Sequence, residues 1–391
     1  MALQPAAGAR DLNPREVEHQ RWLCEQLARV YRRWGYQEVA PPSIERLDTL
    51  EAGGAIAGRE VVRLVADAPL GLRPELTASI ARAASTRMVH RPRPLRLWAS
   101  GTTFRAFLGE GGDLRISETL QSGVELLGEP SDAAEMELMH LLLTAVASLG
   151  LQPEHQPSLL VGHHGLLGAL LEVVPEALRH QARERLTDFD CLGLEALPIS
   201  EPARARLKAL LQLRGEPQQV LRQLEQWLGP SPLLSRLEAL LASVEPLANQ
   251  VGVRLQLDPT FQPHFDLYDG LVFKLVCQGE EAPVAIASGG RYDRLVGRFC
   301  DDAALAAGTG FGFSIPALQE LFAADAARSP RVGPWLVAAA DARLLPTALA
   351  RMAALHGEGE AAELCPQACA TEDEAQRRAA ERGCRGVIWL A

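Results

Sequence analysis

A polar pattern on the segment 119–127 offers a surface for a ligand. Strand geometry places Gln121, Gly123 and Glu125 on one face and the intervening, mostly apolar residues on the other. An amide and a carboxylate on either side of a glycine can hold a polar ligand, because glycine lets the ligand approach the backbone. An exposed amphipathic strand shows the same alternation. This segment alone therefore leaves both interpretations open.

Glu75, Thr77 and Arg105 add charge and hydrogen-bonding capacity at the ends of predicted elements. Glu75 and Thr77 follow Pro74 at the start of a predicted helix, where they can take the ammonium group of a zwitterion. They can equally cap that helix and compensate its dipole. Arg105 ends a predicted strand, where its guanidinium can hold a carboxylate or phosphate. A surface ion pair is the alternative for this arginine.

Glycine and cysteine motifs elsewhere carry weaker signals. The pair Gly289–Gly290 permits a tight turn or close backbone approach after a short apolar strand. The segment Gly308–Gly312 lacks the lysine and the strand-to-helix context of a phosphate loop, so we interpret it as structural. Cys365 and Cys369 have no second ligand pair in the sequence, and His163–His164 are adjacent. We therefore predict no metal site and no cofactor.

Periodicity and capping signals predict the elements that position these groups. A helix is predicted to begin at the capping box of Asn13 and Glu16 and to end before Gly35. Another helix is predicted after Ser131. The glycine-containing segment 106–118 is predicted to be a long hairpin loop. The predicted strands cover residues 38–40, 95–104, 119–127, 253–257, 267–277 and 284–287.

The order of these elements favours an α+β protein with an antiparallel sheet flanked by helices. Residues 153–251 are leucine-rich with helical periodicity, and we interpret them as a helical insertion. Proline and glycine between residues 329 and 334 indicate a hinge. A strand–helix–helix–strand pattern after it predicts a small C-terminal α/β domain. We therefore predict domains at 1–325 and 331–391.

Composition indicates a globular protein of the cytoplasm. The chain has 391 residues, 47% hydrophobic and 23% charged, and no apolar run long enough to span a membrane. Its start lacks the features of a signal peptide. Seven scattered cysteines suit a reducing compartment. The formal net charge of −10 argues against tRNA as a partner, because nonspecific nucleic-acid affinity comes mainly from phosphate neutralisation.

The order and spacing of these motifs resemble histidyl-tRNA synthetases over roughly residues 6–322. That resemblance implies a class II synthetase-like fold and a homodimer formed through the first class II motif. It also implies an amino-acid pocket formed by Glu75, Thr77, Arg105, Gln121, Glu125 and Tyr268, with Asp266, Gly289, Arg291 and Tyr292 as secondary candidates. The resembling segments are 8–14, 35–42 with Glu45, 73–77, 96–128, 289–295 and 310–313.

Three departures from the synthetase pattern fall on the ATP side of the implied reaction. Pro263 stands where a catalytic arginine is expected, and Phe107 replaces an acidic residue. Ser314–Pro316 replace the arginine of the third motif. Adenylation develops negative charge, and losing one fixed stabilising group typically costs about 10²–10³ in rate. We therefore expect no catalytic residues in this chain.

The sequence keeps the amino-acid-binding residues of the synthetase pattern but departs from it on the ATP side. In this combination it resembles the regulatory-subunit family of short-form ATP phosphoribosyltransferases. The resemblance implies a short catalytic subunit as partner and feedback inhibition by L-histidine, through this pocket or a subunit interface. One alternative is a working aminoacyl-tRNA synthetase in which Arg291 or Arg294 replaces the missing arginines. The other is a synthetase-like enzyme that activates an amino acid for another acceptor, such as a carrier protein.

Overall fold

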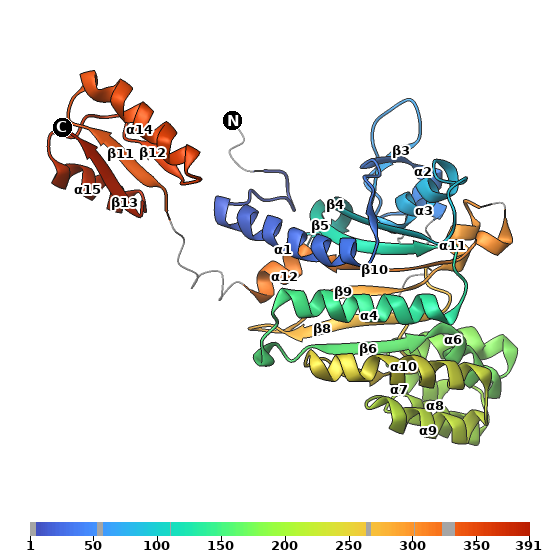
Figure 1. The fold of residues 1–391 in the computed structure, drawn as a ribbon. Coiled ribbons are helices and arrows are strands. Elements are labelled where there is room, and N and C mark those ends of the chain that lie inside the picture. Colours follow the sequence, from blue (N-terminus) through green and yellow to red (C-terminus); the bar gives the residue numbers. More distant parts are fainter. Residues whose placement is uncertain (1–4, 53–57, 110, 263–266, 301, 323–332) are drawn as a thin grey trace. The chain divides into compact units, whose positions relative to one another are not determined.

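The computed structural model describes residues 5–52, 58–109, 111–262, 267–300, 302–322 and 333–391 (Figure 1). The chain divides into two compact units, Met1–Ala323 and Ala324–Ala391, which we describe separately. The domain boundaries at 325 and 331 stay predictions, because residues 323–332 lie outside the described part.

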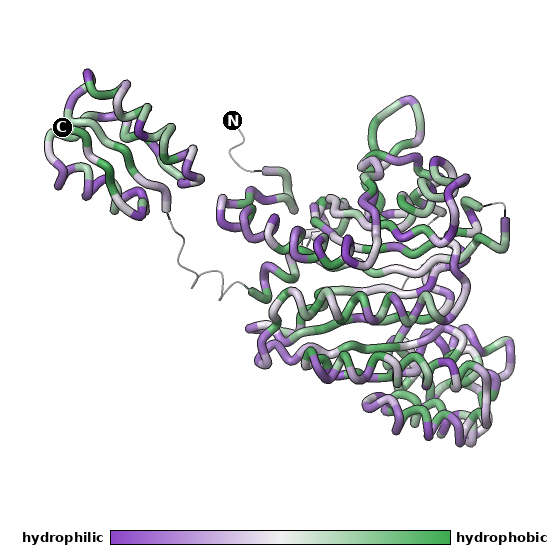
Figure 2. The backbone as a smooth tube through the Cα atoms, viewed as in Figure 1, coloured by the Kyte–Doolittle hydropathy of each residue, from purple (hydrophilic) through white to green (hydrophobic). Residues whose placement is uncertain are grey.

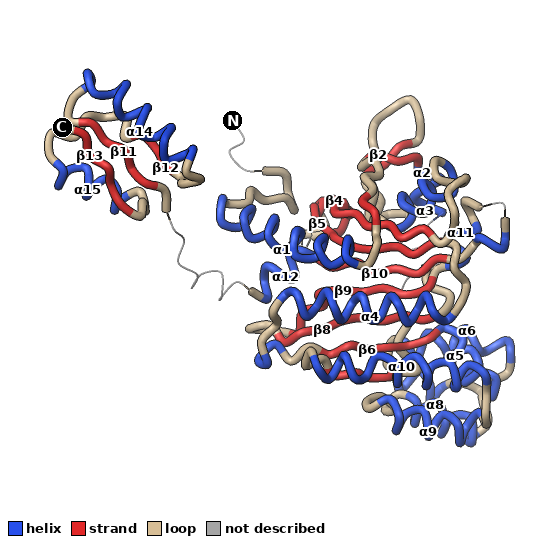
Figure 3. Tube along the Cα trace, in the orientation of Figure 1, coloured by secondary structure: helices blue, strands red, loops and turns tan. Residues whose placement is uncertain are grey.

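An eight-stranded sheet forms the centre of the first unit (Figure 3). Two pairs, β1 with β4 and β6 with β7, are parallel, and the other neighbours are antiparallel. The predicted α+β class is confirmed. In spatial order the strands are β1 (Gln37–Glu38), β4 (Leu95–Leu108), β5 (Leu114–Leu127), β10 (Gly308–Ser314), β9 (Pro283–Arg291), β8 (Leu271–Gln278), β6 (Ser158–His163) and β7 (Arg254–Leu257).

The first helix begins and ends as its sequence predicts. The side chain of Asn13 accepts hydrogen bonds from the Arg15 and Glu16 amides, and the Glu16 carboxylate accepts one from the Asn13 amide. Gly35 follows the helix with a φ of +82°, a conformation that glycine adopts at little cost. Hydrophobic and hydrophilic residues alternate along this helix, α1 (Pro14–Arg33), and its apolar side packs on the sheet (Figure 2).

The hairpin between β4 and β5 corrects the predicted loop at 106–118. The two strands pair continuously out to Leu108 opposite Leu114. The turn is therefore confined to residues 109–113, of which residue 110 lies outside the described part. The glycines that suggested a long loop are concentrated in this short turn, while alternating residues on both sides extend the ladder.

Helices cover both faces of the sheet. Apolar side chains of α1, α4 (Asp132–Leu149), α10 (Pro232–Gln250) and α12 (Ile315–Leu321) share one buried cluster with Trp98 and Val124. On the other face, α3 (Thr77–Thr86) and α11 (Asp293–Gly297) pack against Leu97 and Leu127. A separate two-stranded sheet, β2 (Ile44–Arg46) with β3 (Leu70–Leu72), lies beside α2 (Leu47–Ala52).

The predicted helical insertion at 153–251 is wrong at its start, because Ser158–His163 form β6 within the main sheet. A short apolar run cannot be assigned to helix or strand by periodicity alone. The helices that follow β6 are α5 (His164–Leu170), α6 (Glu176–Thr187), α7 (Cys191–Ala196), α8 (Glu201–Leu210) and α9 (Pro217–Leu228). Short 3₁₀ turns lie before β6 at Pro153–His155, after α5 at Leu171–Val173, and before β10 at Ala303–Leu305.

The second unit is a parallel three-stranded sheet in the order β12 (Ala362–Leu364), β11 (Trp335–Ala339), β13 (Gly386–Leu390). Helix α14 (Leu345–Gly357) follows a 3₁₀ turn at Ala342–Leu344, and α15 (Glu372–Glu381) precedes β13. Leu336 and Ala338 of β11 belong to an apolar cluster on one side of this sheet, and Val337 and Ala339 belong to a separate cluster on the other side. Sequence patterning predicts β11, both α-helices and β13, but neither the short strand β12 nor the 3₁₀ turn.

Candidate functional site

Cross-strand pairing gathers glycines beside Gln121 and Glu125. Gly101 pairs with Gln121, Gly310 pairs with Glu125, and Gly312 pairs with Gly123. Directly paired residues project from the same face of a sheet. A Cβ added at Gly312 would meet no atom within 4 Å. The sheet face that carries the predicted polar residues therefore has several glycines without side chains, and the space above Gly312 is unfilled.

The carboxylate of Glu125 is the buried centre of this face. Only 4% of Glu125 is exposed. The Thr77 hydroxyl donates to one carboxylate oxygen at 2.7 Å, and the Tyr292 hydroxyl donates to the other. Burial raises the pKa of Glu125 to about 8, the two hydroxyl donors oppose that rise, and the charge of Glu75 adds to it. A cationic ligand would favour the ionised form.

Glu75 caps the helix that presents Thr77. Its carboxylate accepts hydrogen bonds from the backbone amides of Thr77 and Ala78, the latter at 2.9 Å. Burial raises the pKa of Glu75, while these donors and the nearby Arg105 charge lower it. The capping interpretation of Glu75 is therefore confirmed. Thr77, by contrast, turns its hydroxyl toward Glu125.

Arg105 and Tyr268 complete the surroundings of the two carboxylates. The Arg105 Nε donates to the Pro74 carbonyl at 3.3 Å, which holds this half-buried side chain beside the start of α3. The Tyr268 ring packs over Gly290, where an added Cβ would lie 2.7 Å from Tyr268 Cδ1. Burial and the charges of Glu125 and Glu75 raise the pKa of Tyr268, so it is a neutral hydrogen-bonding group at physiological pH.

Two secondary candidates lie on the opposite face. An added Cβ at Gly289 would lie 2.6 Å from Phe311 Cβ, within the core packed against α4. Arg291 forms an ion pair with Glu135 at 2.6 Å and donates to the Ser131 carbonyl at 3.1 Å. Their placement corrects the expectation that they line the pocket. Tyr292 is on the Glu125 side, as alternation from Gly290 requires, and Asp266 lies outside the described residues.

Two aspartates outside the predicted set, Asp269 and Asp293, bind backbone amides of the segments next to Tyr292. Asp269 accepts hydrogen bonds from the backbone amides of Asp293 and Arg294 at 3.1 and 2.6 Å. Asp293 accepts from the Gly308 amide at 2.9 Å. The sequence could have indicated both aspartates, because each directly follows a candidate tyrosine, in the motifs Tyr-Asp-Gly at 268–270 and Arg-Tyr-Asp at 291–293.

The altered positions are occupied by residues with structural roles. Ser314 caps α12, since its hydroxyl accepts a hydrogen bond from the Ala317 amide at 3.4 Å, and Pro316 lies in the first turn of that helix. Phe107 is 42% exposed near the tip of the β4–β5 hairpin. Pro263 lies outside the described residues. Ser314 therefore supplies no cation where the third-motif arginine is expected, and Phe107 supplies no carboxylate where the acidic residue is expected.

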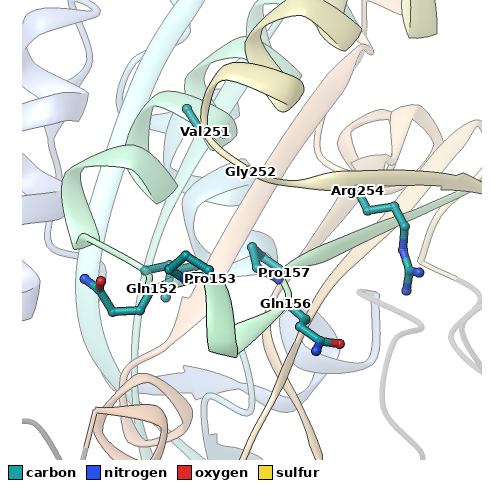
Figure 4. Close-up of a pocket in the computed structure, with 8 residues that line it drawn as sticks. Gln152, Pro153, Gln156, Pro157, Val251, Gly252 and Arg254 are labelled. Carbon is teal, nitrogen blue, oxygen red and sulfur yellow. The ribbon is translucent and has the colours of Figure 1, made fainter.

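A separate hollow near the start of β6 and β7 is not part of this site (Figure 4). It encloses about 410 Å³ and contains a single charged side chain, that of Arg254. None of the predicted site residues contributes to it. It is lined by Leu151, Gln152, Pro153, Gln156, Pro157, Val251, Gly252 and Arg254.

The described part of the chain holds no cluster of metal-ligating side chains and no membrane-spanning helix. No group of three or more histidine, cysteine or acidic side chains there has the arrangement of a metal site. None of the described helices is long and apolar enough to cross a membrane.

The chain is similar over its whole length to proteins named ATP phosphoribosyltransferase regulatory subunit. It is 53% identical to one from Synechococcus sp. (strain RCC307) and 52% identical to one from Prochlorococcus marinus (strain MIT 9303), with all of each chain covered. The chain belongs to this family of regulatory subunits. A role as a regulatory rather than a catalytic subunit is therefore supported by family membership.

The histidyl-tRNA synthetase family model also matches, over residues 8–318. A Bacillus halodurans structure, titled ATP phosphoribosyltransferase regulatory subunit/histidyl-tRNA synthetase, aligns with a TM-score of 0.83 at 25% identity, covering 100% of this chain and 98% of that one. The Nostoc sp. PCC 7120 histidyl-tRNA synthetase structure aligns with a TM-score of 0.81 at 19% identity, covering 100% and 92%, which shows the shared fold. The predicted class II synthetase-like fold of this regulatory-subunit family member is confirmed.

The raised pKa of Glu125 predicts that stability falls as the pH rises. An unfolded glutamate releases its proton near the ordinary value of 4.5, whereas folded Glu125 keeps it up to about 8. Between these values the folded chain binds more protons, so the free energy of unfolding decreases with pH. Urea unfolding at about pH 5.5 and about pH 8 measures this slope.

Substitution separates Glu125 from the other titrating groups in that measurement. Glu125→Gln cannot ionise and is expected to flatten the slope. Glu118→Gln is the matched control, because Glu118 is exposed on the other face of the same strand and should leave the slope unchanged. Equal slopes in both variants would contradict the role given to Glu125.

Proposed function

We propose that this chain is the non-catalytic regulatory subunit of an ATP phosphoribosyltransferase, and that it makes the activity of a short catalytic subunit sensitive to histidine. The supporting observation is the contrast within one site. Glu75, Thr77 and Glu125 form a bonded polar cluster, whereas Ser314 serves as a helix cap at an expected arginine position.

The cluster has the chemistry to bind a histidine zwitterion. Glu125, flanked by Glu75, provides a negative site for the ligand ammonium group, and Arg105 provides a positive site for its carboxylate. Gln121 is half-buried on the same face and offers an amide to a polar ligand side chain. The glycines on this face of the sheet let the ligand approach the backbone of the strands.

Binding would regulate the complex by linkage. If histidine binds two states of the assembly with different affinity, it shifts the population toward the state it prefers. Histidine and the catalytic subunit's substrates then affect each other's binding reciprocally. This mechanism requires binding energy from the pocket and no bond-making chemistry in this chain.

Reconstitution tests this function. The chain is mixed with a short ATP phosphoribosyltransferase catalytic subunit, and formation of phosphoribosyl-ATP is followed with and without histidine. Activity is expected only with both chains present, and histidine should suppress it. Histidine-dependent pyrophosphate–ATP exchange by the isolated chain would instead support an activating enzyme, and tRNA charging would support a synthetase.

We also propose a homodimer formed through the first class II motif, in the cytoplasm, without tRNA as a partner. Strand β1 of that motif lies at an edge of the main sheet, and buried Glu45 is fixed by an ion pair to Arg82 at 2.7 Å. The seven cysteines are free thiols, which supports a reducing compartment. Light scattering of the purified chain tests the dimer, because a monomer at micromolar concentration would contradict it.

A further inference from the structure

Two cysteine side chains are in contact in the C-terminal unit. Cys365 follows β12, and Cys369 stands four positions later in the loop that leads to α15. Their Sγ atoms are 3.7 Å apart, and both thiols lie within reach of the Gln367 carbonyl oxygen, at 3.3 and 3.7 Å. Both cysteines are free and buried in one apolar cluster.

Strand β11 anchors both ends of this loop. The Cys365 amide donates to the Val337 carbonyl at 2.8 Å, and the Cys369 amide donates to the Ala339 carbonyl at 2.9 Å. The residues between the cysteines, 366–368, are exposed. A disulfide bond is about 2.0 Å long, so the sulfurs need to approach by less than about 2 Å. The anchors keep the thiols at a high effective concentration, while the exposed residues can adjust.

Local charge distinguishes the two thiols. The Arg378 Nη1 lies 3.7 Å from Cys365 Sγ. Arg378 also pairs with Glu374 at 2.8 Å. Burial raises the pKa of Cys369, and its contact with Cys365 adds to the rise. Cys365 retains 3% exposure against 0% for Cys369 and contacts the guanidinium, so we assign it as the sulfur that meets the oxidant first.

The third cysteine of this unit is a poor competitor. The Cys384 thiol donates to a carboxylate oxygen of Glu363 at 3.3 Å. Burial raises the pKa of Cys384 to about 11, and this hydrogen bond adds to the rise. A protonated thiol bonded to a carboxylate is neither nucleophilic nor directed toward Cys365.

We propose that Cys365 and Cys369 form a thiol-modification site that closes to an intramolecular disulfide with a low-molecular-weight disulfide such as oxidised glutathione. The Cys365 thiolate attacks one sulfur of the oxidant, forms a mixed disulfide and releases one glutathione thiolate. Cys369 then loses its proton and attacks the Cys365 sulfur, which releases the second. Two protein thiols are oxidised, and one small disulfide is reduced to two thiols.

Peptide mass spectrometry of the full chain tests this site directly. The chain is equilibrated with mixtures of reduced and oxidised glutathione, quenched with acid, alkylated and digested with trypsin. Residues 352–377 contain both cysteines and no internal lysine or arginine, whereas Cys384 falls in a different tryptic peptide. The 352–377 peptide is expected to lose the mass of two hydrogen atoms and to carry no alkyl group.

Two substitutions and one internal control make the outcome decisive. In Cys369→Ser and Cys369→Ala, the intramolecular bond cannot form, so glutathione should accumulate on Cys365 while circular dichroism shows an unchanged fold. Exposed Cys191 in the first unit reports that the oxidant is active. Full alkylation of Cys365 and Cys369 while Cys191 is oxidised would overturn the proposal. A cross-link to the Cys384 peptide would overturn it as well.

Discussion

Histidine binding to this chain is expected to weaken by about 100-fold when Glu125 is replaced by glutamine, which corresponds to about 2.7 kcal/mol. The substitution keeps the size of the side chain and removes the carboxyl group that would ionise when the ligand ammonium group binds. Hydrogen bonds to charged groups contribute about 1.5–3 kcal/mol. Glu125 also lies in a buried setting, between the Thr77 and Tyr292 hydroxyls, where solvent screens the interaction weakly.

Isothermal titration calorimetry of the wild-type chain and two variants measures this effect. Glu118→Gln makes the same chemical change on the same strand but on the opposite, exposed side, so its affinity should match the wild type. Equal affinity in Glu125→Gln would show that histidine binds elsewhere. If histidine binds only after the catalytic subunit is added, and Glu125→Gln has no effect there, the ligand site is at the subunit interface.

A Gly310→Ala substitution is expected to destabilise the first unit by about 3 kcal/mol, the upper end of the usual cost of overpacking. A Cβ at this position would collide with the Glu125 carboxylate and the Val124 carbonyl oxygen. Gly310 pairs with Glu125 on one side and with Gly290 on the other, so β10 cannot move away from the clash without breaking a ladder.

Gly312→Ala is the matched control for this prediction. It adds the same methyl group to the same face of the same strand, where it meets no atom within 4 Å. Its free energy of unfolding should stay within about 1 kcal/mol of the wild-type value. Urea unfolding compares the two variants. Equal losses of stability would mean that glycine is needed for strand conformation rather than for the close approach of Glu125.

These two experiments separate the pocket's charge from its shape. Glu125→Gln is expected to change affinity without changing volume, whereas Gly310→Ala changes packing without removing a charge. A chain that keeps its fold in Glu125→Gln and loses histidine sensitivity in the reconstituted complex would connect the pocket to regulation.

The sequence predicted much of the site because its signals are local. Alternation along 119–127 correctly placed Gln121 and Glu125 on one face of β5, and the start of the helix at Thr77 was expected from Pro74 and its flanking polar residues. The capping box of Asn13 and Glu16 located α1 for the same reason. Each of these patterns depends on residues within one or two turns of each other.

Other features depend on partners that are distant in the sequence. Ser158–His163 is a short apolar run whose strand conformation depends on pairing with β8 and β7. The hairpin strands extend beyond Phe104 because their ladder continues to Leu108 opposite Leu114. In both places local propensity was ambiguous, and hydrogen bonding to another strand determined the result.

By itself, the sequence determined the α+β class, the polar face of β5 and the altered residues at Phe107 and Ser314. It predicted a strand only over 284–287, whereas β9 continues to Arg291, which places Gly289 and Arg291 on one face and Gly290 on the other. Only the tertiary structure decided which of those faces meets Glu125. The pairing of Gly290 with Gly310, and of Gly310 with Glu125, sets that choice. A strand's own alternation has two equivalent faces, and neighbouring strands alone decide which face is turned toward the site.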